Sequence, residues 1–60
     1  MSEYYILVDP SGHYRPITAT YYAEHPLEMH DNKIVDKATN YVDACYVAGI
    51  LNTAAEVMES

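Results

Sequence analysis

The tetrapeptide Asp9-Pro10-Ser11-Gly12 constrains this 60-residue chain strongly, because strand-forming residues flank it on both sides. Pro10 presets the backbone for the second position of a turn, the Asp9 side chain can bond back to the backbone, and Gly12 tolerates a left-handed conformation. This combination is typical of a type I turn followed by a bulge in a three-residue hairpin loop. The sequence therefore predicts a β-hairpin with strands at about 3–9 and 13–23.

The turn type also predicts the register of this hairpin. It places Leu7 opposite Arg15 and Tyr4 opposite Thr18. Pro16 has no N–H group, so we expect its nitrogen to point away from the neighbouring strand. Apolar side chains would then lie on both faces of the hairpin, and one helix can cover only one of them. The second hairpin face, which we expect to need a further layer, comprises Tyr4, Ile6, Val8, Tyr14 and Tyr22.

Apolar residues at helical spacing predict one long C-terminal helix over about 32–58. Asp31 or Asn32 would cap its start. A glycine costs about 1 kcal/mol in a helix interior, so this helix is either continuous or bent near Gly49. Before it, the segment 26–29 is expected to form a short helical turn with Pro26 at its first position. The predicted fold class is α+β, a hairpin followed by one long helix (ββα), in a single domain over residues 1–60.

The predicted helix carries two apolar stripes that point to nearly opposite sides. The earlier stripe, in which Cys45 is interpreted as a buried packing residue, comprises Ile34, Ala38, Tyr41, Val42 and Cys45. The later stripe, which we interpret as a self-association seam, comprises Val47, Ile50, Leu51, Ala54, Val57 and Met58. A domain of this size buries only about 60% of its unfolded surface, and a single cysteine allows no internal disulfide. We therefore expect a homo-oligomer.

The charge balance restricts the classes of partner. Nine acidic residues against three basic ones give a net charge of −6, and Arg15, Lys33 and Lys37 are the only basic side chains. Binding to nucleic acid or to an anionic membrane requires clustered Lys and Arg, so neither is expected as a direct partner. A basic protein surface is a complementary target. The candidate residues for binding it form a predicted acidic strip of Asp36, Asp43 and Glu28; the alternative is that these carboxylates only maintain solubility.

The aromatic residues are unusual, because the chain has seven tyrosines and no Phe or Trp. Tyrosine combines apolar area with a polar tip, which suits a protein-binding surface. The alternative is plain strand propensity, since six of the seven lie in or beside the expected strands or the start of the helix.

The sequence contains no strong motif for metal binding, catalysis or phosphate binding. His25 and His30 stand near Glu24, Glu28 and Asp31, but their spacing matches no established metal motif, so we expect neither a metal nor a cofactor. The chain has no credible Ser/His/Asp arrangement and no glycine-rich phosphate loop, so we expect no enzyme. One hypothesis that stays open is a small-ligand site between subunits, built from His13, His25, His30 and Arg15.

The residues that follow Met1 contain no basic segment or long apolar run, so we expect no signal peptide and a cytoplasmic location. Small acidic proteins of this kind are often regulators or inhibitors that bind another protein, including phage-encoded inhibitors of host defence that block the basic site of a nucleic-acid enzyme. The first hypothesis is such a protein-interaction module. The alternative hypothesis is a structural or assembly subunit of a homo-oligomer.

Overall fold

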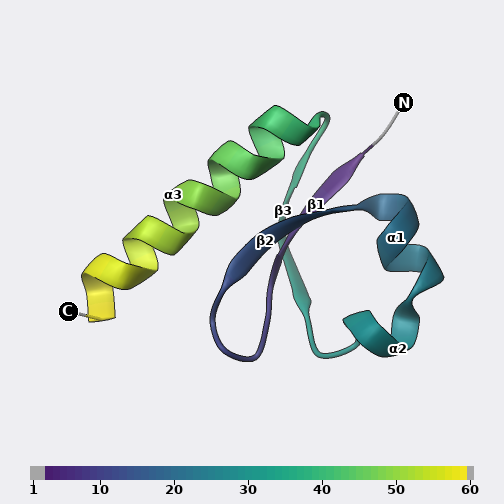
Figure 1. The fold of residues 1–60 in the computed structure, drawn as a ribbon, viewed down its shortest axis with the longest axis horizontal. Coiled ribbons are helices and arrows are strands. Elements are labelled where there is room, and N and C mark those ends of the chain that lie inside the picture. Colours follow the sequence, from purple (N-terminus) through teal and green to yellow (C-terminus); the bar gives the residue numbers. More distant parts are fainter. Residues whose placement is uncertain (1–2, 60) are drawn as a thin grey trace.

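The computed structural model describes residues 3–59 and confirms the α+β fold class, since a β-hairpin leads to a long C-terminal helix (Figure 1). The three strands form one antiparallel sheet in the order β2-β1-β3. The elements follow one another as β1 (Tyr4–Val8), β2 (Tyr14–Thr18), α1 (Ala19–Glu24), α2 (Pro26–Met29), β3 (Lys33–Ala38) and α3 (Tyr41–Glu59).

The hairpin has the predicted turn and register. The Gly12 N–H donates to the Asp9 carbonyl at 2.9 Å, and Gly12 has a positive φ of 88°. The Asp9 N–H donates in turn to the His13 carbonyl at 3.0 Å. Along the strands, Leu7 pairs with Arg15 and Tyr4 pairs with Thr18, as the turn chemistry predicts. The left-handed glycine closes the turn at no steric cost.

The second strand ends earlier than predicted. β2 stops at Thr18, and residues 19–24 form α1 rather than the end of a strand. The Thr18 side-chain oxygen accepts a hydrogen bond from the Tyr21 N–H at 3.0 Å, which is an N-cap. Ala19 and Ala23 are strong helix formers, so the cap and local propensity together overcome the strand preference of the two tyrosines between them. The short helical turn over 26–29, with Pro26 first, is confirmed as α2.

The largest correction concerns the start of the long helix. Residues 33–38 form strand β3, and α3 begins at Tyr41 rather than near residue 32. Ile34 and Val35 are β-branched, and β1 offers a free edge once it has paired with β2, so strand pairing satisfies the backbone of this segment. The cap of α3 is Asn40, not Asp31 or Asn32: its Oδ1 accepts the Asp43 N–H at 2.9 Å. α3 continues through Gly49 as one helix.

The main core cluster lies between the sheet and α3, whereas the fully buried Leu7 and Met29 lie outside this cluster. Ile6, Ala44 and Ala48 are its buried centre. The half-buried residues that pack around this centre are Tyr4, Tyr14, Ala38, Val47 and Leu51. The prediction that the second hairpin face needs a further layer is therefore wrong for most of that face, because the chain's own helix covers it. Tyr22 lies elsewhere, with its ring edge-on to the Tyr5 ring at 5.5 Å.

Asn52 attaches α3 to the sheet. Its Oδ1 accepts the Tyr14 N–H at 2.8 Å, and its Nδ2 donates to the Tyr14 carbonyl at 2.8 Å. Hydrogen-bonded pairs alternate along an antiparallel ladder, and Asp9 with His13 is such a pair. The backbone groups of Tyr14 and the nitrogen of Pro16 therefore point away from β1, as expected for a proline in a strand. The amide of Asn52 satisfies both polar groups of Tyr14.

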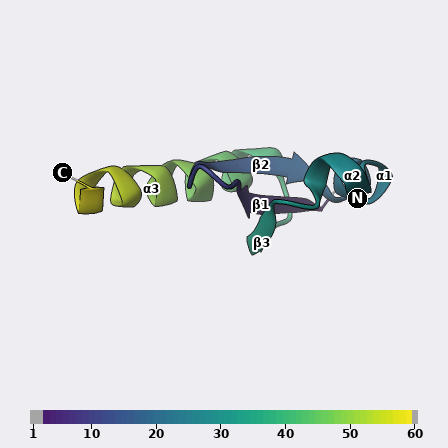
Figure 2. The ribbon, with the colours of Figure 1, turned by 90° about the horizontal axis from the view of Figure 1, so that it is seen from below.

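The molecule is flat. Its Cα atoms extend over 36 × 25 × 11 Å, and Figure 2 shows α3 lying beside the strongly twisted sheet in a thin body. The solvent-accessible surface is 4404 Å², whereas a compact monomer of 6.8 kDa exposes about 3,950 Å². The chain thus exposes about 450 Å² more than the average for a folded monomer of its mass. Part of this surface lies on α3.

Candidate functional site

α3 presents an apolar face to solvent, opposite the face that packs on the sheet. Ala44 and Ala48 are buried against the sheet. The opposite face, which we call the outer strip, consists of Cys45, Tyr46, Gly49, Ile50, Thr53 and Ala54, extended at its ends by Val42 and Val57. The exposed fractions are high for such apolar side chains: 75% for Val42, 70% for Tyr46 and 52% for Ile50. Contiguous exposed apolar surface of this kind marks interaction sites in soluble proteins.

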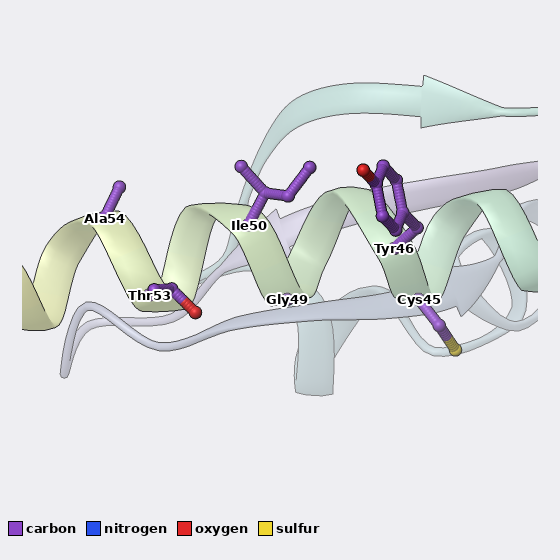
Figure 3. Close-up of a pocket in the computed structure, with 6 residues that line it drawn as sticks. All are labelled: Cys45, Tyr46, Gly49, Ile50, Thr53 and Ala54. Atoms are coloured by element: carbon purple, nitrogen blue, oxygen red, sulfur yellow. The ribbon is translucent and has the colours of Figure 1, made fainter.

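The outer strip consists of two rows with an open hollow between them. Figure 3 shows Tyr46, Ile50 and Ala54 pointing to one side of the helix, while Cys45 and Thr53 point to the other, with Gly49 between these two. The shallow hollow over these residues has a volume of ≈ 640 Å³. A Cβ atom on Gly49 would meet nothing within 4 Å, so the packing of the chain itself does not require a glycine here. A glycine that its own chain does not need leaves room for the close approach of another backbone.

The outer strip is uncharged in a protein with a net charge of −6. At about 100° per residue, Asp43 and Glu56 lie on opposite flanks of the strip rather than within it. A hydrogen bond with the Cys45 side chain is the main cause that raises the pKa of the Tyr41 phenol. Cys45 is exposed, so its interpretation as a buried packing residue is corrected: Ala44 and Ala48 occupy the inner face instead.

The structure divides the predicted self-association seam between two sides of α3. Val47 and Leu51 are half-buried against the core, whereas the exposed members of the seam are Ile50, Ala54, Val57 and Met58. Sequence reasoning missed Tyr46, Gly49 and Thr53. Their signal is the 4-3-4 spacing of Val42, Tyr46, Gly49 and Thr53, and it was hidden because the apolar residues of the helix were grouped into two other stripes.

The three carboxylates of the predicted acidic strip lie on three different elements. Glu28 on α2 accepts hydrogen bonds from the Tyr21 hydroxyl at 3.1 and 2.9 Å. Asp36 on β3 accepts the Lys37 N–H, and Asp43 accepts a bond from the Asn40 amide at the start of α3. The six residues of β3 separate α2 from α3 by about 20 Å, and Figure 1 shows these helix ends well apart. The carboxylates are thus exposed but do not form one compact patch.

The histidines considered as ligands have local partners. The His25 ring stacks on Tyr21 at 3.9 Å between ring centres, and its Nδ1 lies 3.0 Å from the Tyr21 carbonyl oxygen. The hydrogen bond that Tyr21 donates to Glu28 raises the pKa of the Tyr21 phenol. His30 Nε2 lies 3.1 Å from Asp31. Within residues 3–59, no group of three or more His, Cys, Asp or Glu side chains is placed to hold a metal ion.

The other residues of the ligand hypothesis lie near the hairpin. His13 lines a hollow of ≈ 300 Å³ between the hairpin turn and α3, together with Asn52 and Glu56. Arg15 lies two residues further along, on β2, and is exposed. The structure therefore does not assemble His13, His25 and His30 into one site within the chain, since they belong to different segments.

Comparison with known protein families, with curated proteins and with solved structures gives no match for this chain. In the part of the chain that the structure describes, no helix has the length and apolar character needed to span a membrane.

Proposed function

We propose that this chain is a protein-interaction module that works by binding protein, with the outer strip of α3 as its main docking surface. The observation that supports this proposal is the exposure of Tyr46 and Ile50 on an uncharged helix face, beside a glycine on which a Cβ would meet no atom of residues 3–59 outside its own helix turn within 4 Å. Tyrosine is enriched at the energetic centres of protein interfaces, whereas Lys, Glu and Asp are depleted from interface cores.

The test is site-specific photo-crosslinking from position 50 in cells that produce the protein. A benzophenone amino acid replaces Ile50, and a matched variant carries it at Thr20, an exposed position on α1. We expect a discrete protein adduct from position 50 that the Thr20 variant does not give. The proposal is wrong if position 50 yields no adduct beyond the background of the control. An adduct with a foreign protein and an adduct with a second copy both support it.

The finer proposal is that the module is a regulator or inhibitor and that its carboxylates contact a basic partner, for example the basic site of a nucleic-acid enzyme. Its support is the net charge of −6 and the exposure of Asp36 and Asp43 on β3 and α3. Charge complementarity of this kind steers association and is screened by salt. The alternative is an assembly subunit of a homo-oligomer, which the outer strip supports equally.

The carboxylates can be tested once a partner is identified by crosslinking. Replacing Glu28, Asp36 and Asp43 together by alanine should slow association and remove most of its dependence on ionic strength, because exposed charges act mainly on encounter rates. Stopped-flow association over a salt series measures both quantities. A variant with Asp31→Ala, which lies beside His30 in a turn, serves as the control. An unchanged salt dependence in the triple variant would refute the role of these carboxylates.

A further inference from the structure

We infer that the outer strip of α3 is occupied by a second copy of this chain, packed antiparallel about a two-fold axis beside Gly49. This inference rests on the proposed function, because it names the occupant of the same surface. The area of the molecule favours a second copy. The chain exposes about 450 Å² more than a compact monomer of its mass, and the smallest specific interfaces bury about 600 Å² on each partner. An interface of that size on each copy covers more than this excess.

The charge distribution permits this contact between copies. Each copy carries a net charge of −6, so two copies repel wherever carboxylates meet. The outer strip contains no charged residue. In an antiparallel pair centred on Gly49, the flanking Asp43 lies near Val57 of the other copy, and Glu56 lies near its Val42. No carboxylate then faces another across the contact.

The side chains of the outer strip match in size when the strips of two copies pack antiparallel. A two-fold axis across an antiparallel helix pair places each row against the same row of the other copy, in the opposite order. In the row of small residues, Gly49 then meets Gly49, and Cys45 meets Thr53. Small residues at a spacing of four allow two helix backbones to approach closely at the glycine.

The row of Tyr46, Ile50 and Ala54 also fits against the same row of the other copy when the two run in opposite directions. Along this row the side chains shrink in the order Tyr46, Ile50, Ala54, and all three point to the same side of the helix (Figure 3). Reversal places Tyr46 over Ala54 of the other copy, the largest side chain against the smallest, while the two Ile50 side chains meet at the axis. The antiparallel direction also aligns the two helix dipoles favourably.

The first measurement is the solution mass by light scattering across a dilution series. The wild type should have twice the monomer mass of 6.8 kDa when concentrated and approach 6.8 kDa on dilution. Ile50→Lys introduces two charges at the axis, so it should remain at 6.8 kDa at every concentration with an unchanged circular dichroism spectrum. Thr20→Lys adds the same charge on α1 and should dimerise like the wild type. A wild type that is monomeric throughout overturns the inference.

The second measurement fixes the orientation by disulfide crosslinking. Thr53→Cys with the native Cys45 should give two intermolecular disulfides on mild oxidation, with loss of all free thiols and a doubled mass on non-reducing gels. The native Cys45 residues of the two copies would lie about 12 Å apart along the helices, beyond disulfide reach, so the wild type should not crosslink. Thr20→Cys controls for collisional oxidation. A dimer in which the Thr53→Cys variant fails to crosslink contradicts the antiparallel pairing.

The outcomes separate this inference from the proposed function. A foreign adduct from position 50 together with a monomeric wild type would refute the second copy and leave the docking surface in place. An adduct of twice the monomer mass from position 50, with the Ile50→Lys variant monomeric, supports both. If position 50 gives no adduct and the wild type does not dimerise, both the docking surface and the second copy are refuted.

Discussion

At the scale of single residues, Asn52 is the side chain on which the attachment of α3 depends most directly. Its two 2.8 Å bonds to Tyr14 are half-buried and join positions that are 38 residues apart in sequence. Asn52→Ala leaves the Tyr14 N–H and carbonyl without partners, and a buried unsatisfied group costs about 1–3 kcal/mol. We expect a loss of this size in the free energy of unfolding, measured with urea at fixed protein concentration. The exposed Thr20→Ala should change it by no more than about 0.5 kcal/mol; an equally small loss at Asn52 would contradict the role assigned to it.

Asp9 makes the hairpin turn sensitive to acid. Its Oδ1 accepts bonds from the Ser11 hydroxyl at 2.6 Å, the His13 N–H at 2.9 Å and the Ser11 N–H at 3.0 Å. The Ser11 hydroxyl is the main cause that lowers the pKa of Asp9 below its usual 3.8. Because the pKa is depressed on folding, the contribution of Asp9 to stability is present above pH 3.8 and is lost as the pH falls through the lowered value.

The corresponding measurement is an NMR titration of the Asp9 carboxyl, with thermal unfolding of the wild type and Asp9→Ala compared over the same pH range. The two proteins should differ in melting temperature at neutral pH and converge in acid. If the difference in melting temperature between the wild type and Asp9→Ala grows as the pH falls, Asp9 does not stabilise the fold through its ionised carboxylate.

At the scale of elements, the sequence predicted the parts whose signals are local. The hairpin and its register follow from four turn residues, and they are confirmed. Strand β3 could not be predicted in this way. Ile34 and Ala38 happen to continue the helical spacing of Tyr41 and Cys45, so the sequence pattern favours a helix there. Their strand state depends on a free edge of β1, which is a tertiary property. The outer strip was misassigned for a related reason, since which face of α3 is buried depends on the sheet that packs against Ala44 and Ala48, which is also a tertiary property.

The cap of α3 is the local signal that marks this start. Asn40 accepts the Asp43 N–H with its Oδ1 and donates to the Asp43 carboxylate with its Nδ2, both at 2.9 Å. Asn40→Ala removes this reciprocal pair and should lower the free energy of unfolding by about 1 kcal/mol. Asn40→Asp keeps the oxygen acceptor but sets a second carboxylate beside Asp43, so it should recover only part of the loss. Urea denaturation of the three proteins compares them; a fully stable Asn40→Ala variant would show that the cap is not needed.

At the scale of the whole molecule, stability and association are coupled through Gly49. A helix-interior glycine costs about 1 kcal/mol relative to alanine, and an added Cβ meets nothing within 4 Å among the described residues. Gly49→Ala should therefore raise the free energy of unfolding of the dilute monomer by about 1 kcal/mol. In the dimer the same methyl group separates the two helices, so the dissociation constant should rise.

Urea unfolding at low concentration and light scattering at high concentration measure these opposite effects on one variant. Ala54→Gly, on the other row of the strip, is the reverse exchange and should destabilise the monomer by a similar amount. If Gly49→Ala both stabilises the monomer and strengthens the dimer, the close approach at Gly49 is refuted.

The contact between Asn52 and Tyr14 has a consequence for how the sheet can grow. The outer side of β2 offers few groups to an incoming strand: Pro16 has no N–H, and a side-chain amide already occupies both the donor and the acceptor of Tyr14. Asn52 thus acts as a one-residue substitute for a fourth strand, and it terminates the sheet on that side. The other edge of the sheet is β3, where another chain could still add a strand. Its charged residues Lys33, Asp36 and Lys37, and the irregular pairing of β3 with β1, disfavour such aggregation.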